Sequence, residues 1–403
     1  MDKPLEGIRV LDLSRILAGP WCSQHLADLG ADVIKVEHPE RGDDTRGWGP
    51  PYLEGTQEAA YYLAANRGKR SIAVDIAQQE GQALIRELVA SCDVVLENFK
   101  VGGLKRYGLD YETLKQVRPD LVYCSITGFG QSGPYAKRAG YDFLLQGMGG
   151  LMDITGRPDD EPGGEPMKVG VAVVDLFTGM YAATSILSAL LGRNRTGEGA
   201  WIDLALMDVQ VSMLANQAMN FLTSGQSPTR LGNSHPNIVP YQAFATADGH
   251  IILAVGNDGQ FKRFCEVAGM PLMASDERFA TNRSRVQNRK LLVPQIERLI
   301  CAKPTSYWLE SLEREGVPCG PINTIEQVFS DPQIQHRGMK MQMPHPQAGK
   351  VNLVSNPIRF NDQPLNADAL PPRLGEHTQA VLSELLPDRI AYLDGLRAKG
   401  IIR

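Results

Sequence analysis

A single carboxylate stands out within a long apolar segment of the chain. The segment 169–192, VGVAVVDLFTGMYAATSILSALLG, carries one acid, Asp175. At helical spacing its larger side chains form an apolar stripe of Leu176, Met180, Leu187 and Leu190. The acid falls on another face, together with Thr178, Gly179 and Ala182. Because these side chains are small, that face would let another backbone or a ligand come close.

Two roles are open for Asp175 from its spacing alone. We expect a helix over 173–192, so the acid lies in or just before its first turn. Free N–H groups and the helix dipole favour an anion there, and the commoner role is therefore a helix cap. The alternative is a carboxylate nucleophile that is held ionised and aimed at an electrophile. Spacing favours the cap by about two to one.

Composition and charge restrict the class of protein and its partners. The chain has 403 residues, of which 43% are hydrophobic and 22% charged, and its net charge is -5. This balance gives no electrostatic case for nucleic acid or an anionic membrane. No uninterrupted apolar run is long enough to span a bilayer, and the N-terminal sequence lacks a signal-peptide core. We therefore predict a cytoplasmic protein that acts on small molecules, without nucleic-acid or membrane partners.

The cysteines and histidines show no pattern that would bind a metal. The six cysteines include no C-x-x-C pair, and the seven histidines are scattered without metal-ligand spacing. We interpret the cysteines as reduced core or surface thiols. The sequence thus predicts no metal site.

Strands alternate with helices through the first half of the chain. Buried apolar runs predict strands at 8–13, 32–37, 71–76, 92–99, 121–130 and 200–206. Helices are expected at 22–29, 78–91, 173–192 and 207–223. This alternation predicts an α/β fold with a doubly wound, mostly parallel, Rossmann-like sheet. We assign residues 1–224 to this large domain, which would carry the ligand and the catalytic residues.

The alternation of strands and helices ends near residue 225. A turn-rich connector leads to 241–255, which predicts a β-hairpin with Asp248 and Gly249 at its turn. Helices are expected at 259–268 and 287–301. We therefore predict a small α+β domain over 225–330, followed by a C-terminal segment, 331–403, that returns to the large domain.

Several loops follow the predicted strands and could hold a ligand. An open α/β sheet binds ligands beyond the carboxyl ends of its strands, where polar or glycine residues occur at 17–20, 38–46, 97–100 and 128–130. The basic loop 66–70, NRGKR, suits phosphate or is a solvated turn. The loop 256–260, GNDGQ, is either a mobile cover over an intermediate or a plain strand–helix connector. No G-x-G-x-x-G or Walker A motif follows the first strand, so a nicotinamide dinucleotide is not indicated.

Taken together, these stretches resemble the class III coenzyme A transferases, the family of formyl-CoA transferase and carnitine CoA-transferase. The resemblance covers nearly the whole chain and rests on GADVIKVEHP, NRGKRSIAVD, DVVLENF, GFGQSGP, VDLFTG and GVPCGPI. The succinyl-CoA–glutarate (hydroxymethylglutarate) branch is the most similar, through GDDTRGWGPP, YCSITGFGQSGP, RAGYD, LMDITG and IVPYQAF.

The resemblance implies an activity and a set of site residues. In this family the aspartate of the D-x-x-T-G motif attacks the acyl-CoA thioester, and that residue is Asp175 here. The implied substrates are an acyl-CoA and a carboxylic acid, without a metal or a redox nucleotide, and the family forms an interlocked homodimer. Positions that match the family's CoA contacts are Leu17, Ala18, His38, Val74, Asp75, Ile76, Ala77, Asn98, Phe99, Lys100, Arg106, Ala139, Gly140, Tyr141 and Asp142. The family's glycine loop corresponds to Gly256, Asn257, Asp258, Gly259 and Gln260.

Departures from the family pattern bear on the substrate. Formyl-CoA transferases carry Gln at the position of Leu17 and Arg at that of His38, and their glycine loop lacks the interruption by Asn257 and Asp258. An oxalate or formyl substrate is therefore not favoured. Two competing interpretations are an α-methylacyl-CoA racemase and a CoA-binding scaffold without turnover. Racemases of this fold use a G-H-D motif for proton transfer, and Tyr141 takes the place of that histidine here.

The glutarate branch suggests succinyl-CoA as donor and a dicarboxylic acid as acceptor. The second carboxylate must meet a cation, because burying it unpaired is costly. Arg46 and Arg67 are the candidates, since a guanidinium meets a carboxylate in two parallel hydrogen bonds. Either arginine could instead bind CoA phosphate or a neighbouring acid such as Asp43 or Asp44.

Overall fold

The computed structural model describes residues 3–403, which form two compact units. The first unit comprises residues 3–150, Val169–Ala218 and Pro332–Arg403. The second comprises Leu151–Lys168 and Met219–Asp331. The second unit thus takes up a segment, 151–168, that precedes the long helix of the first.

A six-stranded sheet forms the centre of the first unit. Its strands are β1 (Arg9–Asp12), β2 (Asp32–Glu37), β3 (Lys69–Ala73), β4 (Val94–Glu97), β5 (Val122–Thr127) and β6 (Ala200–Ala205). They lie in the order β3-β2-β1-β4-β5-β6, and every neighbouring pair is parallel. The α/β prediction is confirmed. The chain order reverses between β1 and β4, which is where such sheets open a crevice for ligands.

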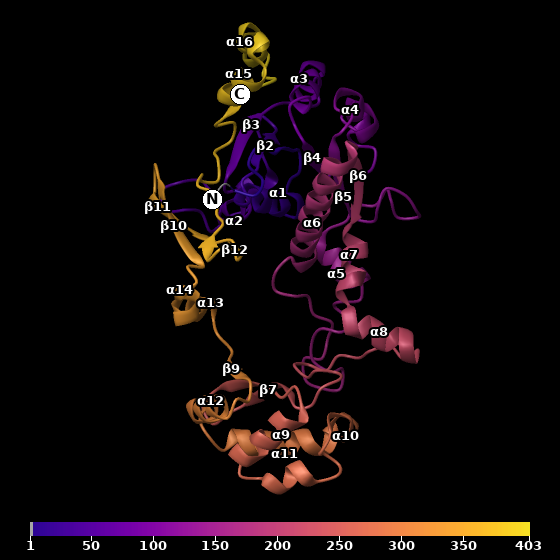
Figure 1. Ribbon diagram of the computed structural model, residues 1–403, viewed down its shortest axis with the longest axis vertical. Helices are drawn as coiled ribbons and strands as arrows, with labels where there is room; N and C mark the ends of the chain where they lie inside the picture. The colour runs from indigo at the N-terminus through magenta and orange to yellow at the C-terminus, as the bar shows by residue number, and fades with distance from the viewer. Residues whose placement is uncertain (1–2) are drawn as a thin grey trace. The chain divides into compact units, whose positions relative to one another are not determined.

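Helices cover both faces of this sheet, as Figure 1 shows. One face packs on α1 (Ala18–Asp28) and α6 (Val173–Thr196), with Val10, Val33 and Val94 from the strands. The other face packs on α3 (Gln79–Val89), α4 (Tyr111–Val117), α15 (Thr378–Leu385) and α16 (Ile390–Ala398), with Leu11, Ile34 and Val95. Successive strand residues thus face opposite layers, which explains why the strands are apolar throughout.

Shorter helices of this unit lie at the ends of the strands. They are η1 (Asp44–Gly47), α2 (Ala60–Ala64), η2 (Lys105–Tyr107), α5 (Asp142–Met148) and α7 (Leu206–Met213). The predicted helix 207–223 is two helices, because Ala215 has φ 44° and ends α7 before α8 (Ala215–Ser224) begins. An alanine in the left-handed region does not continue a right-handed helix.

The small-residue face of α6 packs closely against α1. A Cβ added at Gly179 would lie 2.7 Å from the carbonyl oxygen of Ala18, so this contact requires glycine. The predicted close approach of another backbone is confirmed. The opposite face leaves Phe177 and Leu191 exposed.

By length and apolar composition, α6 also qualifies as a helix that could cross a membrane. Because Asp175 interrupts the apolar residues of α6, the sequence shows no uninterrupted apolar run there. Core helices pass the same test, and α6 packs on α1 and on β5 and β6 within the unit.

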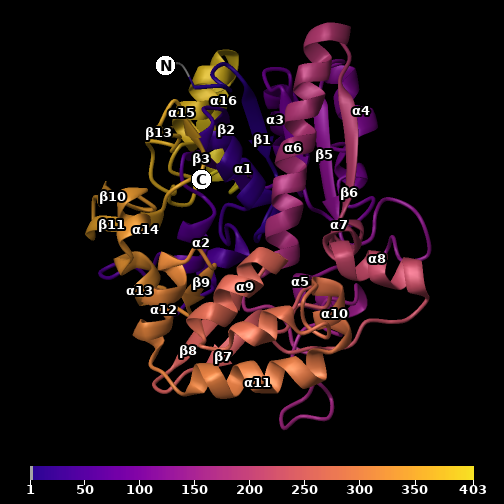
Figure 2. The same ribbon diagram turned by 60° about the horizontal axis from the view of Figure 1, so that its bottom comes forward.

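The second unit contains a three-stranded antiparallel sheet covered by helices. The predicted hairpin is confirmed as β7 (Tyr241–Ala245) and β8 (His250–Ala254), and β9 (Cys319–Pro321) pairs with β8. The helices are α9 (Asp258–Val267), η3 (Pro271–Ser275), α10 (Asn282–Gln287), α11 (Arg289–Cys301), α12 (Thr305–Arg314) and α13 (Ile325–Ser330), several of which appear in Figure 2. Their apolar faces enclose a core of their own around Phe244, Phe261 and Trp308.

The C-terminal segment belongs to the first unit. It contains α14 (Pro332–His336), the hairpin of β10 (Lys340–His345) and β11 (Gly349–Val354), and the short pair β12 (Arg359–Phe360) and β13 (Gln363–Pro364), with η4 (Pro387–Arg389) between α15 and α16. The N–H of His377 bonds to the carbonyl of Ser71, and the Thr378 hydroxyl accepts from Ala73 N at 3.0 Å. The chain thus returns to the edge of the parallel sheet at β3.

Candidate active site

Asp175 is the third residue of α6, but it does not cap this helix. Ala172 is the N-cap residue and offers no side-chain hydrogen bond. The cap comes from α5: Asp142 Oδ1 accepts from Val174 N at 2.8 Å and from Asp175 N at 3.3 Å. Thus a carboxylate does bind the helix start, and it belongs to Asp142.

The carboxylate of Asp175 is left without a cation. Within residues 3–403 its oxygens make no hydrogen bond or ion pair, and the side chain is partly buried. Burial, followed by the charge of Asp142, raises the pKa of Asp175 to about 7. A carboxylate with little solvation and no bound donor is a better nucleophile than an ordinary aspartate. This geometry favours the nucleophile role over the cap.

An aromatic pair lies near this acid. Burial raises the pKa of Tyr61, in α2, and the charges of Asp175 and then Asp142 raise it further. Trp48 contacts the Tyr61 ring edge-on, with ring centroids 5.0 Å apart. The sequence analysis named neither residue, because no motif marks them. The one available signal was a tyrosine, whose ring is apolar and whose hydroxyl is polar.

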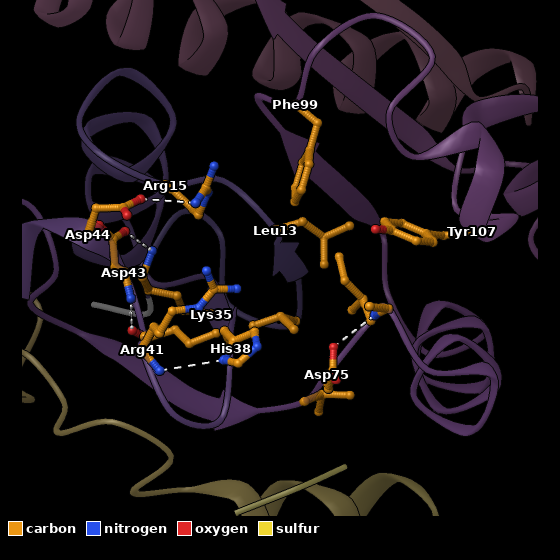
Figure 3. A pocket seen from close by; sticks show the side chains of 16 residues that line it. Leu13, Arg15, Lys35, His38, Arg41, Asp43, Asp44, Asp75, Phe99 and Tyr107 are labelled. Carbon is orange, nitrogen blue, oxygen red and sulfur yellow. Dashed lines mark hydrogen bonds and ion pairs between the residues drawn. The ribbon is translucent and has the colours of Figure 1, made fainter. Parts of the chain in front are cut away.

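A cavity of about 200 Å³ opens at the carboxyl ends of β1 to β4, and we call it the strand-end cavity. Six of the predicted CoA contacts line it: His38, Val74, Asp75, Ile76, Ala77 and Phe99. Figure 3 shows Phe99, Leu13 and Tyr107 on one side and His38 and Arg41 on another. Predicted contacts that follow three separate strands, β2, β3 and β4, thus line one cavity.

The polar side of the strand-end cavity is positively charged in part. The His38 ring accepts from the N–H groups of Glu40 and Arg41, at 3.2 and 3.4 Å, through Nδ1. Arg15 pairs with Asp44 at 2.9 Å and is half exposed. Arg41 is exposed, and in the described part of the chain its guanidinium has no ion pair. It is thus available to an anionic ligand.

The remaining predicted CoA contacts lie outside the lining of this cavity. Leu17 and Ala18 are buried at the start of α1, and Asn98 bonds to the backbone N–H and C=O of Arg15. Lys100 lines a second cavity of about 260 Å³, and Arg106 is exposed over the Tyr107 ring. Ala139 and Tyr141 are exposed, Gly140 approaches Gly128, and Asp142 points its carboxylate at α6. For these residues CoA contact stays a prediction.

The two arginines chosen for the second carboxylate are both engaged within the protein. Arg67 is buried and donates through Nε and Nη2 to Asp28, at 2.8 and 2.6 Å, and through Nη1 to a backbone carbonyl. Arg46 donates through Nε and Nη2 to Glu37, at 2.7 Å each, and also to Tyr62. In this conformation three of the five guanidinium N–H groups of Arg67 are used and the side chain is buried, so it is not presented to a substrate. The loop NRGKR is correspondingly not a solvated basic turn, since Asn66, Arg67 and Lys69 are buried.

The loop Gly256–Gln260 in the second unit is a connector with many hydrogen bonds. Asn257 caps α9 by accepting from Gln260 N at 2.9 Å, and Gln260 Oε1 accepts from Gly256 N at 2.7 Å. Asp258 accepts from the fully buried Arg285 and from Asn282 N, both at 2.8 Å. These bonds favour the connector over the mobile cover that the glycines suggested.

The part of the chain that the structure describes contains no cluster of side chains that could bind a metal ion. No group of three or more His, Cys, Asp or Glu side chains could hold an ion there. The six cysteines are free, and four of them are buried.

Comparisons with known proteins show the family to which the chain belongs. The sequence profile described as CoA-transferase family III matches residues 5–378. The chain is 54% identical to the succinate–glutarate CoA-transferase of Agrobacterium fabrum, over 95% of this chain and 96% of that protein. It is 45% identical to the succinyl-CoA:glutarate CoA-transferase of Homo sapiens, over 99% of this chain and 90% of that protein. The crystal structure of a CAIB/BAIF family protein from Brucella suis has a TM-score of 0.83 and 54% identity, covering 96% of this chain and 100% of that one.

Proposed function

Because the chain belongs to CoA-transferase family III, we propose that it moves CoA from succinyl-CoA to glutarate or a similar dicarboxylic acid. The relatives from Agrobacterium fabrum and Homo sapiens are named for that pair of acids. The observation that carries the chemistry is Asp175, a partly buried carboxylate without a cation at the start of α6.

The transfer proceeds in four balanced steps through Asp175. The ionised carboxylate attacks the succinyl-CoA thioester, releases CoA thiolate and forms a mixed anhydride. The thiolate then attacks the aspartyl carbonyl, which frees succinate and leaves an aspartyl-CoA thioester. The acceptor carboxylate attacks that thioester and forms a second anhydride, and the returning thiolate takes the acceptor's acyl group. Asp175 is regenerated, and no net energy is needed because one thioester replaces another.

Tyr61 is suited to assist these steps. Its raised pKa keeps the phenol protonated at neutral pH, so it can donate a hydrogen bond. Every step passes through a tetrahedral oxyanion, which a fixed donor stabilises. We assign Tyr61 this role because the charges of Asp175 and Asp142, after burial, both raise its pKa.

The strand-end cavity is the proposed site for the nucleotide of CoA. Leu13, Ile76, Phe99 and Tyr107 offer apolar and aromatic surface for a planar base. Arg41 offers an unpaired guanidinium for phosphate, and Arg15 a second one that Asp44 holds at the rim. His38, which lines the same cavity, presents a ring fixed by two backbone N–H groups.

We further propose an interlocked homodimer located in the cytoplasm. The exposed apolar residues of α6, Phe177, Met180, Tyr181 and Leu191, offer a surface for a second copy. Interlocking ties folding to association, so dilution should not give a folded monomer. Sedimentation at nanomolar concentration tests this, and a folded monomer would exclude interlocking.

The activity is tested with purified protein and a panel of acyl-CoA donors crossed with a panel of acids. New acyl-CoAs are read by mass spectrometry, with Asp175→Asn as the matched control. We expect glutaryl-CoA from succinyl-CoA and glutarate, and weaker transfer to monocarboxylates such as propionate. A clear preference for monocarboxylates would contradict the dicarboxylate assignment, while no transfer to any acid would contradict the activity itself.

A further inference from the structure

Two carboxylates meet at the start of α6, and only one of them is bound to the helix. Asp142, from α5, accepts from the N–H groups of Val174 and Asp175, at 2.8 and 3.3 Å. The free N–H groups of a first helical turn normally attract an acid on that same turn. Since Asp142 accepts from these two donors, the Asp175 side chain is left without a backbone hydrogen bond.

A buried glutamine fixes Asp142 in this position. Gln146 Nε2 donates to Asp142 Oδ2 at 2.6 Å, and its own Oε1 accepts from Val169 N at 2.9 Å. Gln146 is fully buried. Both oxygens of Asp142 therefore accept hydrogen bonds from fixed donors, which prevents rotation of the carboxylate.

We propose that Asp142 is a positioning residue for CoA transfer: it occupies the start of α6 and holds a fixed negative charge beside Asp175, so that Asp175 stays unbound and reactive. The proposal rests on the proposed function for its kinetic consequences. Asp142 needs no contact with substrate, because it acts through the hydrogen bonds and the charge that Asp175 experiences.

The surroundings of Asp175 contain few other charges. α1 presents small and apolar residues to α6, Ala18 and Trp21 at Gly179. Tyr61, from α2, is the other titratable group whose pKa is linked to that of Asp175. Of the other elements packed against α6, α7 carries Asp208 and β6 carries Asp203, while β5 carries no acid. Within residues 3–403, Asp142 is the one charge with a resolved effect on the pKa of Asp175.

Two variants separate the charge of Asp142 from its hydrogen bonds. Asp142→Asn keeps an oxygen for Val174 N but turns its amide against the amide of Gln146. The double variant Asp142→Asn with Gln146→Glu restores that contact, because the carboxylate introduced at position 146 would accept from the new amide and from Val169 N. The double variant thus rebuilds the network while the charge moves to a side chain farther from Asp175.

The acid limb of kcat/KM against pH reports the pKa of Asp175 in the free enzyme. We expect Asp142→Asn to move this limb to lower pH by about one unit, because a like charge is removed. The double variant should fall between Asp142→Asn and the wild type. A purely structural cap predicts a different result, in which the double variant regains the wild-type profile. Asp110→Asn is the control for loss of a capping carboxylate elsewhere, since Asp110 caps its own helix, α4, and its profile should not move.

Infrared titration gives a readout that does not need turnover. The difference between the wild type and Asp175→Asn isolates the Asp175 carboxyl, whose pKa should fall in both Asp142 variants. If wild type transfers no CoA yet this titration shifts, the proposed function fails while the electrostatic role of Asp142 stands. If the titration of Asp175 is the same with and without Asp142, the positioning role is overturned.

Discussion

Buried acids in two regions of the first unit ionise in opposite ways. In and around the strand-end cavity, three buried acids pair with cations: Asp12 with Lys69 at 3.4 Å, Glu37 with Arg46 at 2.7 Å and Asp43 with Lys35 at 2.8 Å. Burial alone would raise the pKa of each acid, but the cations outweigh it, and the pKa of Asp43 falls to about 2. At the start of α6, Asp175 has no cation, and burial with Asp142 raises its pKa to about 7.

The difference shows which acids serve the fold and which serve chemistry. A lowered pKa means that the ionised acid stabilises the folded state, and this contribution is lost as the pH falls through the folded-state value. A raised pKa has the opposite sign, so ionised Asp175 destabilises the folded state at pH values above about 7. A cost of this kind is typical of functional sites, where reactivity is retained at the expense of stability.

Removing the nucleophile should have the largest effect on the active region. Asp175→Asn is expected to reduce CoA transfer by about 10⁴-fold or more, because the covalent route has no substitute. Formation of glutaryl-CoA measures the loss, and sedimentation checks that assembly is unchanged. Transfer at close to the wild-type rate would remove Asp175 from the mechanism.

Removing one member of a buried ion pair should lower the free energy of unfolding without changing the preference among acceptor acids. Arg67→Met leaves Asp28 buried without its guanidinium, and we expect a loss of about 3–5 kcal/mol in the free energy of unfolding. Denaturation by urea measures it. The exposed pair of Arg278 and Asp276 is the matched control, and Arg278→Met should leave the free energy of unfolding nearly unchanged.

Arg67→Met also tests whether Arg67 binds the second carboxylate of the substrate. Because Arg67 is buried and bound to Asp28, dicarboxylates and monocarboxylates of equal length should be affected alike. A selective loss of dicarboxylate transfer in Arg67→Met would show that this arginine leaves Asp28 to bind substrate.

Replacing Asp175, which has no cation, should increase the free energy of unfolding by a smaller amount than Arg67→Met decreases it. Asp175→Asn should raise the free energy of unfolding above pH 7 by about 1–2 kcal/mol, after allowance for solvent screening. The gain should shrink as the pH falls toward 3.8, where the unfolded carboxyl is protonated too. Glu97→Gln provides a parallel case, since burial also raises the pKa of Glu97 to about 7. Equal stability of wild type and Asp175→Asn across this range would contradict the cost assigned to Asp175.

Hydrogen exchange at the α-carbon of a substrate distinguishes CoA transfer from racemisation, and here we expect the smallest effect. Tyr141 stands at the racemase histidine position and is exposed, and a solvent-exposed phenol is a poor base at neutral pH. We expect no deuterium to enter the α-carbon of a 2-methylacyl-CoA in heavy water. Mass spectrometry measures the exchange, and rapid incorporation would favour the racemase alternative.

The sequence predicted the sheet well because each strand is a buried apolar run that carries its own signal. It also located the strand-end cavity, whose lining follows the ends of those strands. It could not predict the cap of α6, since Asp142 lies 33 residues before Asp175 and the pairing exists only in the folded chain. The pairing of Arg67 with Asp28 could not be predicted for the same reason, because the two residues are 39 positions apart. The break between α7 and α8 at Ala215 could not be predicted, because no glycine or proline stands at that position.

Covalent trapping on Asp175 tests the central claim most directly. Protein incubated with succinyl-CoA and then treated with hydroxylamine should carry a hydroxamate on the peptide that contains Asp175, seen by mass spectrometry. Asp175→Asn should carry none, and neither should wild type incubated without acyl-CoA. Transfer of CoA by wild type with no trapped adduct, or an adduct on another residue, would contradict the account of Asp175 as the nucleophile.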